Sequence, residues 1–246
     1  MKRLISSAIA VTASVMFAIT NIHAAELEEI IVTATKKEES LQDVSVSVSV
    51  ISGDKIQEAG LHDLKDIGQY IPNFSVSENA ISTIATMRGV GVGANQSFEQ
   101  SVGLFVDGVH LAKGRQFRTG LFDVERVEVL RGPQGTLFGR NSTAGAMQFI
   151  SAGPGQELEG YVRLTQGNFG KTRIAAAVGG PVNDRLGVRV SGVWEQEDGM
   201  VKNVPEKGNA GWTDYSAMRL VADFQATDDF DVRFKAQFGR SDGSPL

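Results

Sequence analysis

The sequence contains no cysteine among its 246 residues. This absence excludes disulfide bonds, thiolate metal sites, a cysteine nucleophile and the lipid-modified cysteine of an anchored lipoprotein. The three histidines, His23, His62 and His110, are scattered, so the sequence defines no metal site and we expect no cofactor. An excess of positive charge is also lacking, because the net charge is -5 and the pI is near 5.3. We therefore expect no nucleic-acid partner.

Beyond residue 19 the sequence lacks any apolar run long enough for a membrane-spanning helix. The N-terminus has Lys2 and Arg3, an interrupted apolar run over residues 4–19, and small residues at Ala24 and Ala25. This pattern predicts a removable secretory signal over residues 1–25, with a retained anchor helix as the alternative. If the exported protein lies in a membrane, it must do so as a β-barrel.

Residues 42–151 have the mixed pattern of a compact domain of helices and strands. Valines alternate with serines over residues 44–50, which predicts a half-buried strand that ends at Ser52. Ser52 or Asp54 can cap a short helix through Glu58, and a second helical face follows before Pro72.

Two further signals lie in the second half of this region. Asp107-Gly108 separates two apolar runs, residues 101–106 and 109–111, and predicts a β-hairpin because Asp-Gly supplies the positive φ of a tight turn. Residues 127–130 predict another short strand, which runs into a glycine- and proline-rich segment at residues 131–140.

After residue 151 the sequence changes to segments of about ten residues that alternate in polarity. In the third of them, Val188, Val190 and Trp194 fall on one face and Arg189 and Ser191 on the other. One apolar and one charged face at this length is typical of a strand between lipid and a wet lumen. The five segments are residues 157–166, 171–179, 185–196, 216–226 and 231–239.

The connections between these segments differ in length. Residues 180–184 and 227–229 predict tight turns, whereas residues 197–213 form a long polar loop, which is the asymmetry of transmembrane barrels. A soluble sandwich also alternates in polarity and remains an alternative. Five strands cannot close a barrel without leaving backbone groups unpaired in lipid, so we expect a longer protein.

Residues 28–35 form a short segment, apolar at its centre, that is rich in β-branched residues and charged on its N-terminal side. Such a segment favours an extended conformation and can add a strand to the sheet edge of another protein. It can equally be the first strand of an ordinary domain. If it is a docking peptide, we expect it to be exposed and poorly ordered without its partner.

Four blocks of the sequence resemble the N-terminal part of TonB-dependent outer-membrane receptors. They are Glu29-Ile30-Ile31-Val32-Thr33-Ala34, which resembles the TonB box; Leu41-Gln42-Asp43-Val44; Met87-Arg88-Gly89-Val90-Gly91 with Val106-Asp107-Gly108-Val109; and residues 124–141, from Val124-Glu125-Arg126 through Arg131-Gly132-Pro133 to Gly139-Arg140-Asn141. Ser45 departs from the pattern, since the family commonly has proline there.

The resemblance implies an α+β plug domain followed by the first antiparallel strands of a transmembrane β-barrel. It divides the chain into a signal peptide (1–25), a TonB box and linker (26–41), a plug (42–152) and barrel strands (153–246). It implies TonB-dependent transport of a scarce nutrient, most often a ferric siderophore, across the outer membrane. The implied partners are TonB, outer-membrane lipid and the small-molecule ligand.

The resemblance also assigns residues. Glu29, Ile30, Ile31, Val32, Thr33 and Ala34 would bind TonB by strand addition. Arg88 and Arg131 lie in Arg-Gly motifs whose arginines would lock the plug to glutamates of the barrel wall; the alternative is a partner within the plug, such as Glu128. Ligand would be held at plug apices, and the candidates are Asn79, Ser82, Asn95 and Gln96.

Other functions are less well supported by the residues. Ser52-Gly53-Asp54-Lys55 matches the Ser-x-x-Lys of serine hydrolases, but no accompanying Lys-Thr-Gly or Ser-Asp-Asn follows, and we expect no enzyme. A signal-transducing receptor would carry an extra domain before the TonB box. Only about two residues, Glu26 and Leu27, separate the predicted signal from residue 28, which disfavours that alternative.

Overall fold

The computed structural model describes residues 31–33, 36–37, 39–78, 83–92, 99–114, 116, 121–203 and 208–243. The predicted signal peptide lies outside these residues, as do Glu29, Ile30, Ala34, Asn79, Ser82, Asn95 and Gln96. The architecture below is that of the unit that begins at Val32.

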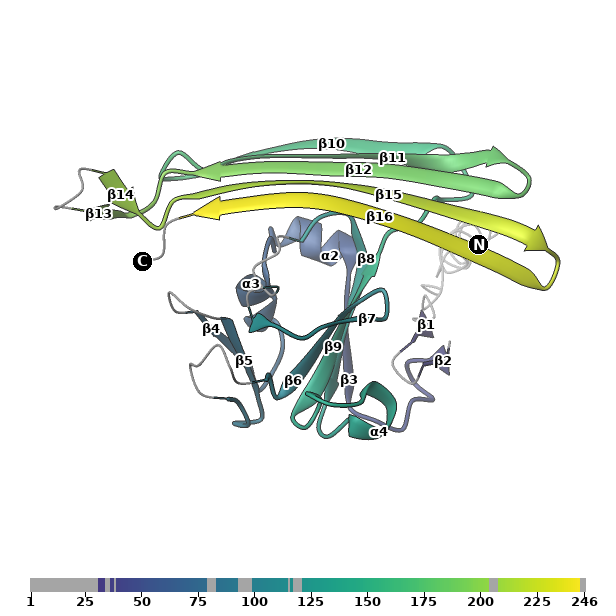
Figure 1. Cartoon of the computed structure of the whole chain (residues 1–246), viewed down its shortest axis with the longest axis horizontal. Coiled ribbons are helices and arrows are strands. Elements are labelled where there is room, and N and C mark those ends of the chain that lie inside the picture. The colour runs from purple at the N-terminus through teal and green to yellow at the C-terminus, as the bar shows by residue number, and fades with distance from the viewer. Residues whose placement is uncertain are drawn as a thin grey trace, which may run out of the picture. The chain divides into compact units, whose positions relative to one another are not determined.

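A mixed five-stranded sheet forms the centre of the first domain (Figure 1). Across the sheet the strands are β3 (Val48–Ser52), β8 (Val124–Arg131), β9 (Gly145–Ser151), β6 (Val102–Val106) and β7 (Val109–Leu111). Only β6 and β9 run parallel to each other. The β6–β7 hairpin turns at Asp107 and Gly108, whose φ values are 47° and 79°, so the predicted Asp-Gly turn is confirmed.

Short helices and a small hairpin complete this domain. They are α2 (Gly53–Glu58), α3 (Leu64–Gly68) and α4 (Gly135–Phe138), with the hairpin β4 (Phe74–Glu78) and β5 (Thr83–Met87). The Ser52 hydroxyl caps α2 by accepting a hydrogen bond of 3.3 Å from the Lys55 N–H. The predicted Ser52 cap is therefore confirmed.

The two faces of the sheet bury different side chains. On one face the helices contribute Ile56, Leu64 and Ile67, which pack against Val127 and Val129 of β8. The other face is covered by the chain that leads into β3, including the partly buried Leu41, Val44 and Val46, and by α4. Burial on both faces gives the domain a sheet that is largely shielded from water.

A second sheet is antiparallel throughout and has the order β10, β11, β12, β15, β16 (Figure 1). Its strands are β10 (Glu159–Gln166), β11 (Thr172–Asn183), β12 (Leu186–Glu197), β15 (Thr213–Thr227) and β16 (Phe230–Gly243). The five predicted segments are thus confirmed. Within the predicted long loop lies an additional hairpin, β13 (Val201–Asn203) with β14 (Gly208–Ala210).

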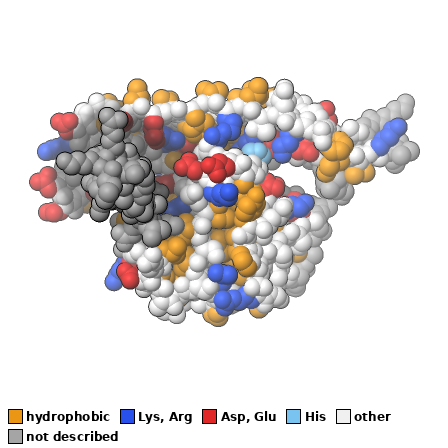
Figure 2. Space-filling model, turned by 180° about the vertical axis from the view of Figure 1, so that it is seen from behind, with side chains coloured by type: hydrophobic (Ala, Val, Ile, Leu, Met, Phe, Trp, Pro, Cys, Tyr) orange, Lys and Arg blue, Asp and Glu red, His pale blue; other side chains and the backbone are white. Residues whose placement is uncertain are grey.

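The predicted alternation is confirmed in β10, β11, β12 and the first half of β15, whereas β16 is exposed along nearly its whole length. In β12, Val190 and Trp194 are exposed, whereas Arg189 and Ser191 are buried against the first domain. Hydrophobic side chains gather along the upper edge of the molecule, where this sheet lies (Figures 1 and 2). The exposed apolar face belongs to a sheet whose other face packs on protein.

Some predicted boundaries were wrong. The strand expected over residues 44–50 begins at Val48, where pairing with β8 starts, although Val44 and Val46 pack against the same cluster as Val48 and Val50. The strand expected over residues 127–130 extends from Val124 to Arg131. Strands β5 and β9 have no clear period-two pattern, and β4 was not predicted although Phe74 and Val76 alternate with serines. In the part of the chain that the structure describes, no helix has the length and apolar character needed to cross a bilayer.

Candidate functional site

The N-terminal segment at Val32 and Thr33 is docked on the sheet. Val32 is fully buried among Leu130, Ala146 and Phe105, and it ends the two-residue strand β1 (Ile31–Val32). The expectation that this segment is exposed is therefore wrong at Val32, although Ile31 is half exposed. Burying a β-branched apolar side chain here removes it from water and stabilises the docked position.

A buried carboxylate holds the next residue. Glu128 of β8 is fully buried and accepts hydrogen bonds from the Thr33 N–H, at 2.9 Å, and from the Thr33 hydroxyl, at 3.2 Å. Gln148, which stands opposite Glu128 on β9, donates to the Thr33 hydroxyl at 3.1 Å. The Arg126 Nε donates to Glu128 at 2.8 Å and supplies the opposite charge that a buried carboxylate requires.

Lys36 makes the third contact of this segment. Its ammonium lies 4.5 Å from the ring centre of Phe138 and 5.2 Å from that of Phe105, distances at which a cation is attracted to an aromatic face. The Lys36 N–H also donates to the Thr33 carbonyl at 2.9 Å, with Lys36 at a φ of 65°. Val32, Thr33 and Lys36 together define what we call the docked segment.

The other end of β8 is bound to the second sheet. Arg189 of β12 donates two hydrogen bonds to the Asp123 carboxylate, of 2.9 and 2.6 Å, and the Asp123 side chain is only 2% exposed. Arg219 of β15 donates to the carbonyl oxygens of Phe122, at 3.1 Å, and Asp123, at 3.0 Å. Arg173 of β11 donates to the Leu121 carbonyl at 2.5 Å. We call residues 121–123 the anchor.

The positions of these three arginines follow from strand geometry. Period two sends Arg173, Arg189 and Arg219 to the same face of three consecutive strands, toward the first domain. Arg219 also lies over the Phe122 ring, with 4.3 Å between the guanidinium carbon and the ring centre. Because each guanidinium donates hydrogen bonds to carbonyl oxygens or to a carboxylate, three buried cations are tolerated at one site.

A fourth cation binds a separate part of the first domain. Lys235 of β16 pairs with Asp107 of the β6–β7 turn and bonds the Ser151 hydroxyl at 2.8 Å. Ser151 donates to the Asp107 carboxylate from its N–H and its hydroxyl, both at 2.8 Å. Burial alone would raise the pKa of Asp107, but the bonds and charge from Lys235 and the Ser151 bonds outweigh it and lower the pKa below its usual 3.8.

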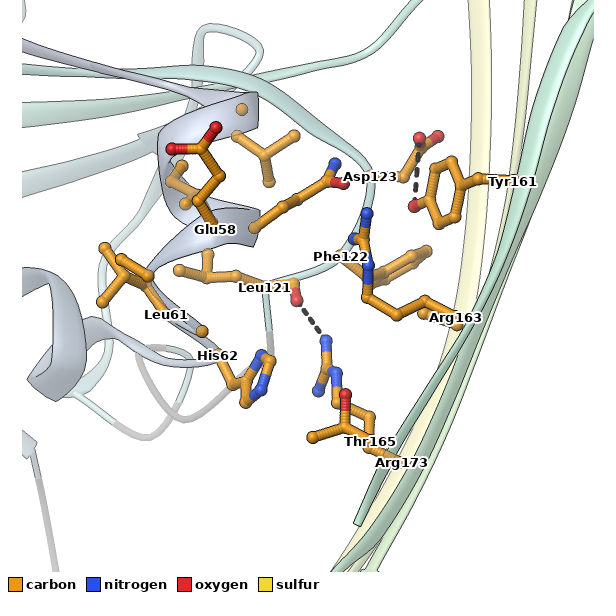
Figure 3. Close-up of a pocket in the computed structure, with 17 residues that line it drawn as sticks. Glu58, Leu61, His62, Leu121, Phe122, Asp123, Tyr161, Arg163, Thr165 and Arg173 are labelled. Atoms are coloured by element: carbon orange, nitrogen blue, oxygen red, sulfur yellow. Dashed lines mark hydrogen bonds between the residues drawn. The ribbon is translucent and has the colours of Figure 1, made fainter. Parts of the chain in front are cut away.

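A cavity of about 290 Å³ lies between α2 and strands β10 and β11 (Figure 3). Glu58 and His62 line its first-domain side, and Arg163, Thr165 and Arg173 line its strand side. Burial and then the charge of Arg173 lower the pKa of His62 below its usual 6.5, which favours a neutral imidazole at this rim.

The two arginines predicted to lock the domains lie elsewhere. Arg88 is exposed and its guanidinium lies beside Gly132, and Arg131 has a buried Nε with no hydrogen-bond partner among the described residues. The alternative partner Glu128 is bound to Arg126 instead of Arg131. Within the described part of the chain, neither arginine has an ion pair with a strand of the second sheet.

In the contacts that join the domains, the positive charges lie on the strands of the second sheet and not on the first domain, which is the reverse of the expectation. Cations on the strands hold acids and carbonyls of the first domain. Sequence reasoning did not single out Asp123, gave Asp107 only a place in a turn, and named Glu128 only as an alternative partner for Arg131. One signal was present for Glu128, since it interrupts the apolar run Val127 to Leu130 of a strand that is covered on both faces.

The Ser-x-x-Lys motif has a structural role. The Ser52 hydroxyl is engaged as the cap of α2, and Lys55 forms an exposed pair with Glu58 at 4.0 Å. This arrangement leaves the lysine directed to solvent rather than toward the serine as a base.

The fold and the contacts define a class of protein. An α+β domain is bound by inward-facing cations of the antiparallel sheet β10–β16, which we call the wall, and the outer face of the wall is apolar. Residues 40–146 match the sequence profile described as TonB-dependent Receptor Plug Domain. Residues 40–146 are thus a plug domain of the TonB-dependent receptors, followed by strands of their barrel.

Relatives in sequence are receptors and transporters. The chain is 29% identical over 174 residues to the pesticin receptor of Yersinia pestis, which covers 69% of this chain and 26% of the relative. It is 32% identical over 233 residues to the vitamin B12 transporter BtuB of Vibrio vulnificus, covering 86% of this chain and 35% of the relative. The chain thus spans about a quarter to a third of the length of these relatives.

Solved structures share the fold. The ferric yersiniabactin uptake receptor FyuA from Yersinia pestis superposes with a TM-score of 0.75 at 26% identity, covering 81% of this chain and 32% of that receptor. The ferripyoverdine receptor of the Pseudomonas aeruginosa outer membrane gives a TM-score of 0.71 at 18% identity, covering 86% and 27%.

Proposed function

We propose that this chain is the N-terminal part of an outer-membrane receptor that imports a ferric siderophore with energy supplied through TonB. The observation that carries the proposal is the plug domain bound by cations to the inner face of barrel strands. Such a plug blocks the lumen, so transport requires its rearrangement. Neither ATP nor an ion gradient exists at the outer membrane, and the energy must arrive by a protein contact.

The division of the chain into signal peptide (1–25), TonB box and linker (26–41), plug (42–152) and barrel strands (153–246) is part of this proposal. So is the role of residues 29–34 as the peptide that adds a strand to TonB. The burial of Val32 implies that the peptide must leave the plug before TonB binds it. Asn79, Ser82, Asn95 and Gln96 remain the candidates for ligand contact.

Arg88 and Arg131 are proposed to complete the lock with glutamates of further strands. The unpartnered, buried Nε of Arg131 supports this, because a buried donor without an acceptor is costly. A double-mutant cycle between Arg131 and each inward glutamate of the complete receptor measures the coupling. No coupling with any of them contradicts the proposal.

A second cargo is favoured by one comparison. The relative that covers 86% of this chain at 32% identity is a vitamin B12 transporter, so cobalamin is the alternative to a ferric siderophore. The two are separated by expressing the complete receptor in cells that lack their own receptors. Radio-iron supplied as ferric yersiniabactin or ferrioxamine B, and labelled cobalamin, are offered to cells with and without TonB. TonB-dependent uptake of iron supports the first cargo, and uptake of cobalamin alone the second.

The TonB contact has its own test in the same cells. Val32→Pro removes a backbone N–H and restrains φ, which disrupts strand addition, so uptake should be lost while ligand still binds at the surface. Ser45→Pro is the matched control, since the related receptors commonly have proline there, and it should import normally. Normal uptake by Val32→Pro would rule out this peptide as the TonB site.

A further inference from the structure

The cavity of about 290 Å³ borders the anchor and lies between the plug and strands β10 and β11 (Figure 3). Leu121, Phe122 and Asp123 line it together with Arg173, so the cavity and the anchor share residues. Pockets for small molecules are about 300–1,000 Å³, which puts this cavity at the lower end of the range. It therefore has room for a small ligand.

Arg163 of β10 brings a positive charge to the lining and extends from its strand into the cavity (Figure 3). Within the described part of the chain its guanidinium forms no ion pair, and it stacks on the Tyr161 ring at 5.1 Å. The other charged groups of the lining each have an oppositely charged partner; these pairs are Asp123 with Arg189, Arg173 with Glu195, and Glu58 with Lys55. The unmatched charge of the cavity is therefore positive.

Neutral hydrogen-bonding groups line both sides of the same space. Gln57 and His62 belong to the plug, and Thr165 belongs to β10. Since burial and the charge of Arg173 lower the pKa of His62, its imidazole is neutral near pH 7 and carries one N–H donor. Amide, hydroxyl and imidazole groups can therefore donate to a ligand whose negative charge faces the guanidinium.

β10 is the strand at this place that is bonded least to the plug. Strands β11, β12 and β15 each hold the anchor with an arginine. Among the described residues, β10 reaches the plug by one hydrogen bond, which the Tyr161 hydroxyl donates to the Asp123 carboxylate at 3.5 Å. A ligand between Arg163 and Gln57 adds a connection where direct contacts are few.

We propose that this cavity is a binding site for a small oxyanion, a phosphate or a carboxylate, which Arg163 holds from the wall while Gln57 and His62 donate from the plug. The planar guanidinium presents two parallel donors that match two oxygens of such an ion. Because the ligand contacts the docked plug and the wall together, it stabilises their contact by mass action. The inference goes beyond transport, since this oxyanion is a ligand of the closed plug and not the cargo.

Binding is tested on the complete receptor, purified in detergent and free of iron, with citrate and inorganic phosphate as probes. Isothermal titration calorimetry at constant ionic strength gives the dissociation constants. We expect saturable binding of at least one probe, and Arg163→Met should weaken it at least tenfold. Arg185→Met is the matched control because Arg185 is an exposed arginine at the β11–β12 turn, outside the cavity, and affinity should be unchanged.

The bridge between plug and wall has a separate readout. Hydrogen exchange of the α2 and β10 amides is compared with and without the bound probe, and chloride at the same ionic strength is the reference. Protection should rise several-fold on both elements in the unmodified receptor and on neither in Arg163→Met. Gln57→Leu removes a donor of the plug side and should weaken binding several-fold.

Every other result overturns the inference. Affinity that Arg163→Met leaves unchanged places the ion elsewhere, and no binding of either probe means that water alone occupies the cavity. Protection of β10 without α2 rules out the bridge, and equal protection by chloride reduces the effect to screening. If Arg163→Met does not fold, Arg163→Lys takes its place; it keeps the charge, loses the paired donors and should bind several-fold more weakly. A failure of the transport proposal leaves these measurements unaffected.

Discussion

Asp123 and Glu128, five positions apart on or beside the same strand, are both buried acids with a defined partner. Asp123 is held by Arg189 from a strand of the wall, and Glu128 holds Thr33 from the N-terminal segment. A buried charge of this kind adds little net stability when paired, yet its loss of a partner is costly. Single substitutions of these two acids or of their partners are therefore expected to have large effects on stability.

Arg189→Met should weaken the hold of the wall on the plug by about 3–5 kcal/mol, because it leaves Asp123 buried without its bidentate partner. The free energy is measured by hydrogen exchange of the plug amides in the complete receptor. Arg163→Met, an inward arginine with no described ion pair, is the matched control and should cost less than about 1 kcal/mol. Equal losses in the two variants would contradict the role of Asp123.

Glu128→Ala should release the docked segment. It removes two hydrogen bonds from Thr33 to a charged acceptor, each worth about 1.5–3 kcal/mol, so the released population should rise about tenfold or more. Trypsin cleavage after Lys36 and Lys37 reports the release. Glu125→Ala changes an exposed glutamate of the same strand and should leave the cleavage rate unchanged.

His62 predicts a dependence of plug stability on pH. Burial and the charges of Arg173 and Lys171 lower its pKa, against the opposing charges of Glu195 and Asp66. The unfolded chain therefore binds a proton near pH 6.5 that the folded one does not, and stability falls as pH drops through 6.5 by at most about 1.4 kcal/mol per unit.

The same hydrogen-exchange measurement, repeated between pH 5 and pH 8, checks this slope. The range is set by the ordinary pKa of histidine, about 6.5. His62→Gln should reduce the slope to the share of His110, whose pKa burial also lowers. A slope unchanged by His62→Gln would show that another group titrates.

At the scale of elements, local signals were sufficient where the cause is local. The Asp107-Gly108 turn and the Ser52 cap depend on neighbours in sequence, and both were predicted correctly. Period two predicted the two faces of β12 in the same way. The predicted strand over residues 44–50 was wrong at its start, because a strand needs a neighbour to pair with and the pairing with β8 begins at Val48, although all four valines pack on one cluster.

Long-range partners could not be read from the sequence. Thr33 and Glu128 are 95 positions apart, and Asp123 and Arg189 are 66 apart. Periodicity predicts which face an arginine occupies but says nothing about what it will meet there. The family resemblance implied that plug arginines hold the strands of the second sheet, whereas in the described residues arginines of those strands hold the plug.

At the scale of the whole molecule, the two faces of the wall have different surroundings. Its inner face contacts the polar plug, and its outer face exposes residues such as Val162, Leu164, Met218 and Phe234. Such a sheet is stable only where lipid covers the apolar side, which is the physical reason to propose a membrane location.

Val190→Arg tests the lipid face. Val190 lies on the exposed face near the middle of its strand, so arginine there should cost about 2–4 kcal/mol in a bilayer. Val182→Arg lies on the exposed side next to the β11–β12 turn and should cost about 0–1 kcal/mol. Urea unfolding of the complete receptor in lipid vesicles compares the two. Equal losses of unfolding free energy in the two variants would contradict the prediction that the cost of arginine rises with depth in the bilayer.

The anchor has a consequence for how interchangeable plugs are. Among the groups that the three arginines contact at residues 121–123, the carbonyl oxygens of Leu121, Phe122 and Asp123 belong to the main chain, and the Asp123 carboxylate and the Phe122 ring are side chains. Main-chain acceptors survive almost any substitution. Most side chains of this docking site can therefore change on the plug side, whereas the arginines on the barrel side must be kept. A plug transplanted into a foreign barrel should bind there when that barrel keeps arginines at the three matching positions and the plug keeps one aspartate and the aromatic ring before it.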